Sequence, residues 1–255
     1  MGANTVRELA RAGYDVALTA RDADRLAAVA AEAEAAGAEA MPLPSDLTDR
    51  ASVEAFADAA TDRFGRCDLV CNIGIYQGPG MQSLFIDTTP DQMATSYEAD
   101  TVAPFLLCQR AIALMLDAGG GTVMNMSSSS VVLDPPGTVE ANGWSLSYVA
   151  AKAGLDRFAS ILNVELGDRG IRAFNVEPGF VAYGSRFAEV LAKYPGIPVS
   201  PPESIGPAIV WLASSPDADR LLPKRVNLPG LTHKQGLLPG WDGPGSDYAT
   251  AYGDS

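Results

Sequence analysis

The sequence contains little histidine, little cysteine and too few positive charges to balance its acidic residues. His233 is the only histidine, so a histidine-based metal cluster is excluded and we expect no bound metal. Cys67, Cys71 and Cys108 are too few for a disulfide framework and favour a reducing, cytoplasmic setting. The formal net charge of −13 argues against nucleic-acid partners and against anionic membrane surfaces.

The sequence also lacks a run of about 18 consecutive apolar residues, so we expect no membrane span. Its first residues show no basic region followed by an apolar core and a cleavage site, so no secretory signal is recognised. The 255 residues, 47% of them hydrophobic, suffice for one large α/β domain. We expect this domain over residues 1–229. A glycine- and proline-rich tail over 230–255 should be extended or loosely ordered, covering a neighbouring subunit or hanging free.

Apolar strand-like segments alternate with amphipathic helical segments along most of the chain. The strand-like segments read "DVALTA", "AEAMPLP", "CDLVCNIG", "GTVMNM", "IRAFNVEPG" and "KRVNLPG". Helices are expected over "RDADRLAAVAAEAEAAG", where Gly37 marks the end, and over about Tyr97–Ala118 and Ser145–Gly167. This alternation is typical of successive βαβ units and predicts an α/β fold with a doubly wound parallel sheet.

Tyr148 and Lys152 stand four residues apart on a predicted helix and so share one face of it. A nearby ammonium favours the tyrosinate and lowers the phenol pKa from about 10 toward the working pH. A tyrosine tuned in this way passes a proton to or from an alcohol oxygen. The alternative is a surface tyrosine beside a lysine whose charge reaches solvent.

Four serines follow the strand-like segment "GTVMNM", at the end where an open α/β sheet binds its ligand. We select Ser128, whose hydroxyl could hydrogen-bond a substrate carbonyl and share the charge that develops on its oxygen. Ser127, Ser129 or Ser130 could equally be the one that points inward, and the four together could form an ordinary polar loop.

These residues occur with "LTAR", "SDL", "CNIG" and "VEPGFV" in an order that resembles the classical short-chain dehydrogenase/reductase family, from Gly2 to about Pro229. The resemblance implies one Rossmann-type domain in a homo-oligomer, a tetramer or a dimer. It also implies hydride transfer between a nicotinamide and a small-molecule carbonyl or alcohol. Tyr148 would be the general acid/base, Lys152 would lower its pKa and hold the nicotinamide ribose, and Ser128 would orient the substrate.

The resemblance also implies a set of cofactor contacts. These are Gly2 in the glycine motif, Asp46 at the adenine amino group, Leu47 beside the base, Asn72 and Gly74 in "CNIG", Pro178 and Gly179 along the nicotinamide, and Val181 at its carboxamide. In "CNIG", Cys71 and Ile73 replace an asparagine and an alanine of the family's pattern. Without the family, Gly74 could equally serve an ordinary turn.

Arg21 favours NADP(H). Folds that bind NAD place an acid at the end of the second strand, whereas an arginine nearby accommodates a 2′-phosphate. Here Ala20 occupies the acid's position and Arg21 follows it, so a guanidinium could bind the phosphate. An exposed arginine that starts a helix is the alternative, and Asp22 weakens the argument, so NAD stays open.

Three features depart from the family's pattern. Asp100 replaces an asparagine that supports a water in the proton relay; we count it as catalytic, since its charge could pair with Lys152 and alter the coupled pKa values. Tyr183 replaces a threonine that bonds the carboxamide. The 19 residues between Ser128 and Tyr148 exceed the usual spacing, and "LDPPGTVEANGW" should cover the substrate pocket.

The family's substrate lid corresponds to residues 182–206. Its aromatic and apolar side chains suggest a pocket that tolerates apolar or aromatic groups, although they could equally pack a helix. They are Tyr183, Phe187, Leu191 and Tyr194.

Aligned on "RELARAG", Met1 and Gly2 fall on the last two positions of the glycine motif, so the first, central strand and the earlier glycines are absent. Without that strand a gap of about 9.6 Å would separate two strands and leave backbone unpaired on both sides. Amides that hold a pyrophosphate would also be missing. We expect either an active protein that starts upstream, of which this chain alone binds cofactor poorly, or a shortened relative without a cofactor site.

Two other functions stay open. One is a non-catalytic relative that acts as a ligand- or partner-binding module, favoured by Asp100 and Tyr183. The other is a sugar-nucleotide epimerase or dehydratase, which shares Tyr-x-x-x-Lys but usually needs a longer carboxy-terminal substrate domain.

Overall fold

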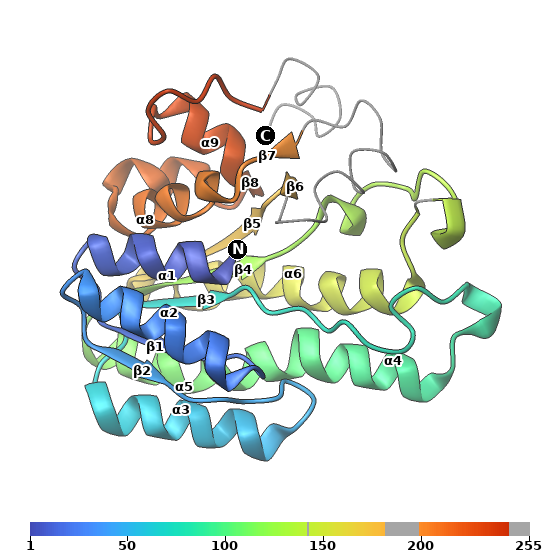
Figure 1. The fold of residues 1–255 in the computed structure, drawn as a ribbon, viewed down its shortest axis with the longest axis horizontal. Helices are drawn as coiled ribbons and strands as arrows, with labels where there is room; N and C mark the ends of the chain where they lie inside the picture. The colour runs from blue at the N-terminus through green and yellow to red at the C-terminus, as the bar shows by residue number, and fades with distance from the viewer. Residues whose placement is uncertain (142, 182–198, 245–255) are drawn as a thin grey trace.

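The computed structural model describes residues 1–141, 143–181 and 199–244, and all six predicted strands are present (Figure 1). They are β1 Val16–Leu18, β2 Ala40–Pro42, β3 Leu69–Asn72, β4 Gly121–Met126, β5 Ile171–Glu177 and β8 Val226–Asn227, and an unpredicted pair adds β6 Phe180–Val181 and β7 Val199–Ser200. Every pairing is parallel: β1 with β2, β6 with β7, and β3, β4, β5 and β8 in one sheet. The predicted α/β fold with a parallel sheet is confirmed.

Helices cover both faces of the strands (Figure 1). They include α1 Gly2–Arg11, α2 Ala23–Ala35, α3 Arg50–Phe64, α5 Ala103–Asp117, α6 Leu146–Leu166 and α8 Gly206–Ser214. Successive side chains of a strand point to opposite faces, and β4 shows the result. Val123 packs with residues of α5 and α6, whereas Met124 and Met126 pack with residues of α8. Burial on both faces explains why β4 carries apolar side chains on each of them, with Thr122 and Asn125 as its buried polar residues.

The sheet is broken between β1 and β3, because no strand among the described residues joins them. Their facing edges therefore have no ladder partner, as the missing central strand predicts. Side chains make the connection instead. Leu69 of β3 packs against the cluster that contains Phe174 and also against the cluster that contains Val16, Leu18 and Leu9. Apolar packing thus holds β1 and β2 against the larger sheet.

The helix predicted from Tyr97 begins earlier than expected. It consists of α4 Pro90–Tyr97, a π-helical turn over Glu98–Val102 and then α5. Thr89 and Gln92 form a capping box at its start, and proline takes the first helical position. The capping box is visible in the sequence, but a search for apolar periodicity alone does not detect it.

One helix in the described part of the chain has the length and apolar composition of a membrane span. It runs over Pro90–Asp117, and an 18-residue window within it has a mean hydropathy of 1.4. Asp100, Gln109 and Arg110 interrupt this segment, so it is not a run of 18 consecutive apolar residues. A single such helix is weak support for a span, because buried core helices have the same composition. Cys108, Ala111 and Met115 of this helix lie in the core with Val123, which accounts for its apolar character.

The predicted tail boundary after Pro229 falls inside α9 Leu228–Lys234. Asn227 caps this helix by accepting the Gly230 N–H at 2.7 Å, and Leu231 and Thr232 are buried. The expectation of an extended chain from residue 230 is therefore wrong for residues 230–234. Residues 245–255 lie outside the described part.

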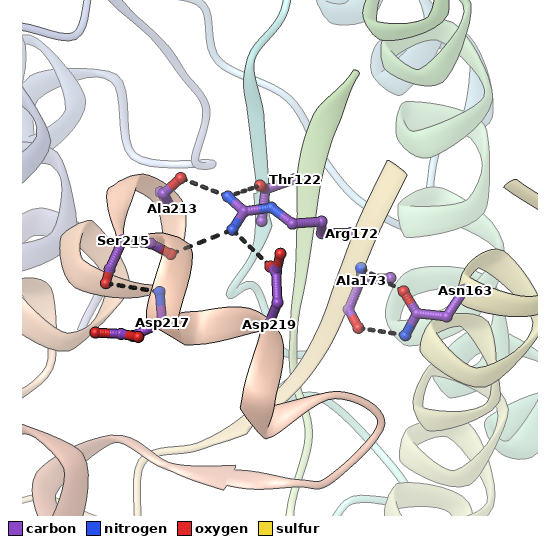
Figure 2. Close-up of polar contacts among 8 residues, drawn as sticks. All are labelled: Thr122, Asn163, Arg172, Ala173, Ala213, Ser215, Asp217 and Asp219. Atoms are coloured by element: carbon purple, nitrogen blue, oxygen red, sulfur yellow. Dashed lines mark hydrogen bonds and ion pairs between the residues drawn. The ribbon is translucent and has the colours of Figure 1, made fainter. Parts of the chain in front are cut away.

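Polar side chains complete the stretch of β5 that β8 does not reach (Figure 2). Asn163 of α6 accepts the Ala173 N–H and donates to the Ala173 carbonyl, both at 2.8 Å, and so replaces a strand neighbour. Arg172 ties β5 to β4 and to the end of α8. Its guanidinium donates to Thr122 Oγ1 at 2.9 Å, to the Ala213 carbonyl at 2.6 Å, to Asp219 Oδ1 at 3.1 Å and to the Ser215 carbonyl at 3.5 Å.

The Arg172→Met substitution should lower the free energy of unfolding by about 2–3 kcal/mol, since it leaves partly buried acceptors without their charged donor. Urea denaturation measures the change. Arg220→Met is the matched control, because the Arg220 side chain is 82% exposed and pairs with Asp217 at the surface. Its effect should stay within about 0.5 kcal/mol. Equal losses for both variants would contradict the structural role of Arg172.

Candidate active site

One face of α6 meets the carboxyl ends of β3 and β4. Ser145 caps the helix by accepting the Tyr148 N–H at 3.3 Å, which sets Tyr148 and Lys152 on that face. Lys152 is 2% exposed, and its Nζ donates to the carbonyls of Met126 at 3.1 Å and Gly74 at 3.4 Å. The ammonium thus joins the ends of two neighbouring strands beside the tyrosine.

Two of the four consecutive serines lie close to Tyr148. The Ser128 hydroxyl acts on the phenol more strongly than the Ser130 hydroxyl does, and both lower the pKa of Tyr148. Ser128 Oγ also accepts the Ser130 N–H at 3.2 Å. The buried Ser130 hydroxyl has no hydrogen-bond partner among the described residues. The structure therefore places Ser128 at the tyrosine with Ser130 beside it.

The other two serines bind charged residues. Ser127 Oγ donates to Asp156 Oδ1 at 2.6 Å and accepts from Arg225 Nη1 at 2.8 Å. Ser129 lies beside Glu177, and its side chain and backbone lower the pKa of that carboxyl group. Alternate serines thus face different partners.

Burial and nearby carboxylates change the pKa of the Tyr148 phenol more strongly than Lys152 does. Burial raises the pKa of Tyr148 above its ordinary value, the Ser128 hydrogen bond lowers it, and the charge of Asp100 raises it further. Burial lowers the pKa of Lys152, and Asp100 opposes this shift. The net direction for Tyr148 is opposite to the lowering that the spacing predicts, because the phenol lies inside the fold near carboxylates.

Asp100 lies on the π-helical turn and is 1% exposed. Its Oδ1 accepts the Tyr76 N–H at 2.7 Å, which ties the segment after β3 to this turn. Burial raises the pKa of Asp100, while the Lys152 ammonium and the Tyr76 hydrogen bond lower it. The expected electrostatic coupling between Asp100 and Lys152 is present.

The residues expected around the adenine lie after β1, β2 and β3. Asp46 Oδ1 accepts the N–H and the hydroxyl of Thr48, both at 2.9 Å; these bonds lower its pKa, and Arg21 adds to the effect. A Cβ at Gly74 would lie 2.7 Å from Leu47 Cδ1. Glycine therefore lets Leu47 pack against the strand end.

Asn72 lies inside the sheet. It is 6% exposed, and its amide donates to Asn125 Oδ1 at 2.9 Å and to Cys108 Sγ at 3.3 Å. The side chain thus links β3 to β4 and α5, and its donors are already used. These contacts give Asn72 a structural role, and the expected cofactor contact at this residue stays a prediction.

The residues expected along the nicotinamide and the pyrophosphate occupy a loop and a helix start. Pro178 and Gly179 follow β5, with Gly179 at a φ of +60°, and Val181 of β6 packs on the core. Gly2 begins α1, whose N-cap residue Met1 makes no side-chain hydrogen bond to the described residues. The first amides of α1 therefore have no side-chain cap.

The sequence matches one protein family over most of its length: a model described as short chain dehydrogenase matches residues 1–193. The chain belongs to the short-chain dehydrogenase family. The D-threitol dehydrogenase of Mycolicibacterium smegmatis is 31% identical over 74% of this chain and 76% of that protein. The 3-oxoacyl-[acyl-carrier-protein] reductase of Synechocystis is 28% identical over 90% and 91%. A metagenomic short-chain oxidoreductase solved in complex with NADP is 30% identical, with a TM-score of 0.61 over 75% of this chain and 83% of that one.

Three charged residues of this short-chain dehydrogenase were missed from the sequence. Asp156 stands four residues after Lys152, so helical spacing could have placed it on the same face. Glu177 directly precedes the "PG" pair, which also could have marked it. Arg225 carries no local signal, because only the pairing of β8 with β5 brings it to the serines.

The pocket cover of this short-chain dehydrogenase is described only in part. Val132 and Leu133, just after the serines, are 67% and 45% exposed, and a 3₁₀ turn follows over Val139–Ala141. Within the described ranges, no group of three His, Cys, Asp or Glu side chains could hold a metal. The predicted lid residues Tyr183, Phe187, Leu191 and Tyr194 lie outside those ranges.

Proposed function

We propose that this short-chain dehydrogenase is an NAD(P)-dependent oxidoreductase that interconverts a carbonyl and a secondary alcohol. The observation that carries the proposal is the grouping of Tyr148, Ser128 and Lys152 at the carboxyl ends of β3 and β4. Open parallel sheets bind their ligands at this edge. The names of the two relatives, a dehydrogenase and a reductase, support the reaction class.

Each residue has a role that its contacts allow. Tyr148 Oη gives a proton to the substrate oxygen in reduction and takes it back in oxidation. The Ser128 hydroxyl donates to the same oxygen and stabilises the negative charge that develops there. Lys152, held between the carbonyls of Gly74 and Met126, favours the tyrosinate and would hold the ribose hydroxyls. A bound nicotinamide supplies or accepts the hydride.

The described residues fit the two ends of a dinucleotide. Arg21 and Asp46 would hold the adenosine end, while Lys152 and the segment 178–181 would hold the nicotinamide end. The uncapped amides at the start of α1 lie on the helix that would face the pyrophosphate. We infer a preference for NADP(H), since Arg21 offers a guanidinium to the 2′-phosphate.

Replacing Arg21 with alanine should weaken NADPH binding about tenfold or more and leave NADH binding unchanged, because only NADPH carries the 2′-phosphate. Quenching of protein fluorescence measures both affinities. Arg25→Ala is the control, since Arg25 lies exposed one turn along α2. Equal losses for the two nucleotides would contradict the assignment.

The function is tested by titrating NADPH into this chain and into a form extended upstream, followed by loss of NADPH absorbance with a panel of carbonyl substrates. We expect saturable binding and turnover by the extended form. Weak binding by residues 1–255 alone is expected too, because the ladder is broken between β1 and β3. Binding by neither form would overturn the proposal.

A second candidate is a ligand- or partner-binding relative without catalysis. The buried Asp100, where the family's pattern has asparagine, and the broken sheet favour it. Nucleotide-free binding of a ligand, with no turnover by either form, would support it.

We also propose a homo-oligomer. Phe105, Ile161 and Val164 on α5 and α6 are 45%, 46% and 87% exposed, and Phe105 packs edge-on against Phe158 with ring centroids 6.1 Å apart. Exposed apolar side chains gathered on neighbouring helices mark association surfaces. Light scattering should give a dimer or a tetramer, and a monomer mass would contradict this.

We further propose a cytoplasmic protein. Cys67, Cys71 and Cys108 are free thiols, and burial raises their pKa values to about 11, 12 and 11. Such thiols are poor nucleophiles and fit a reducing compartment.

The proposed catalytic unit is residues 1–229 together with α9, since α9 packs into the same core.

A further inference from the structure

Arg225 lies at the centre of a network of hydrogen bonds and an ion pair, and it is not among the residues to which a catalytic role is assigned. It directly precedes β8, its side chain is 18% exposed, and its Nη2 pairs with Asp156 Oδ1 of α6 at 2.8 Å. Its Nη1 donates to Ser127 Oγ and to the Ser128 carbonyl, both at 2.8 Å. A guanidinium presents its donors in one fixed plane, so it can hold these partners at the same time. Arg225 therefore binds the backbone on which Ser128 is carried.

A second carboxylate holds the next residue of the serine loop, which we define as residues 127–130. Glu177 at the end of β5 is 6% exposed, and the side chain and backbone of Ser129 lie close enough to lower its pKa. Arg225 also interacts with Glu177 electrostatically. Ser128 thus lies between two anchored residues, and the anchors come from α6, β5 and the start of β8.

We propose that Arg225 is a positioning residue that, together with Asp156, fixes the serine loop so that the Ser128 hydroxyl stays against the phenol of Tyr148. The inference rests on the proposed function only for the catalytic roles of Ser128 and Tyr148. The physical reason is local order. A charge-assisted bond to the Ser128 carbonyl removes the backbone freedom that would otherwise let the hydroxyl turn away.

The test is the titration of Tyr148, followed by NMR on protein with tyrosines labelled at the hydroxyl-bearing ring carbon. Tyr148→Phe assigns the signal, and the other charged groups near it, Lys152, Asp100 and Glu177, stay unchanged. Ser128→Ala should raise the titration midpoint by about one pH unit, because a hydrogen bond that favours the tyrosinate is lost. Arg225→Met should raise it similarly, and should add nothing in the Ser128→Ala background.

The double-variant cycle separates positioning from a direct charge effect. An Arg225→Met shift that persists in the Ser128→Ala background would overturn the proposal, as would an unchanged midpoint. Arg225→Lys keeps the charge without the planar fork and should give an intermediate shift; a midpoint equal to that of the unaltered protein would also overturn the proposal. If Arg225→Met does not fold, Arg225→Lys in the two backgrounds completes the same cycle.

Arg220→Met serves as the control, because it removes one exposed arginine and should leave the midpoint in place. The titration needs neither cofactor nor substrate. A protein that fails to reduce carbonyls would therefore overturn the proposed function, while the cycle would still decide the role of Arg225.

Discussion

Replacing Tyr148 with phenylalanine is expected to lower kcat/KM for carbonyl reduction by about 10³-fold, within the 10²–10⁴ range of positioned general acids. The substitution removes the phenol oxygen beside Ser128 and keeps the aromatic ring that α6 carries. Without the phenol, the substrate oxygen must take its proton from water. The loss corresponds to about 4 kcal/mol of transition-state stabilisation.

NADPH affinity and the urea midpoint should stay close to those of the unaltered protein, because the phenol oxygen is the only group removed. Tyr97→Phe is the matched control, since Tyr97 is 47% exposed at the end of α4 and should keep full activity. A Tyr148→Phe variant that retains more than about a tenth of the activity would show that another group supplies the proton.

Replacing Asp100 with alanine should lower the free energy of unfolding by about 3–5 kcal/mol, the usual cost of leaving a buried charge without its partner. The change removes the carboxylate that acts on buried Lys152 and deprives the Tyr76 N–H of its acceptor. Urea denaturation at neutral pH gives the difference. A loss below about 1 kcal/mol would show that Lys152 is adequately held by its two backbone carbonyls.

Asp100→Asn isolates the charge, because the amide oxygen still accepts the Tyr76 N–H. The charge of Asp100 raises the pKa of Tyr148 and that of Lys152, so its removal should lower both. The limb of the pH–rate profile that reports the tyrosinate should therefore move to lower pH. Because the pKa of Asp100 is raised in the fold, the unaltered protein loses stability as pH rises through that value, and the Asn variant does not.

Structural features that depend on local sequence patterns were predictable from the sequence. The six strands follow from apolar runs, and α6 follows from the Ser145 cap and a long amphipathic repeat. Tyr148 and Lys152 then share a face by helical spacing alone. The start of α4 was missed because its signal is a capping box rather than periodicity.

Features that depend on distant partners were not predictable. Four identical serines carry no local difference, and only Asp156, Arg225 and Glu177 separate Ser127 and Ser129 from the pair at the phenol. The interior role of Asn72 depends likewise on Asn125 in the next strand. The contacts of the serines and the interior role of Asn72 both depend on the order of the strands in the sheet. No local sequence pattern indicates that order.

The break between β1 and β3 also concerns how the molecule opens. The backbone ladder runs without interruption from β3 through β4 and β5 to β8, whereas in the described part of the chain no ladder joins β1 and β2 to it and side chains such as Leu69 make the connection. Regions with few shared hydrogen bonds open at lower free energy than the body to which they are attached. The amide hydrogens of β1 and β2 should therefore exchange with solvent through local unfolding. Those of β4 and β5 should exchange only on global unfolding.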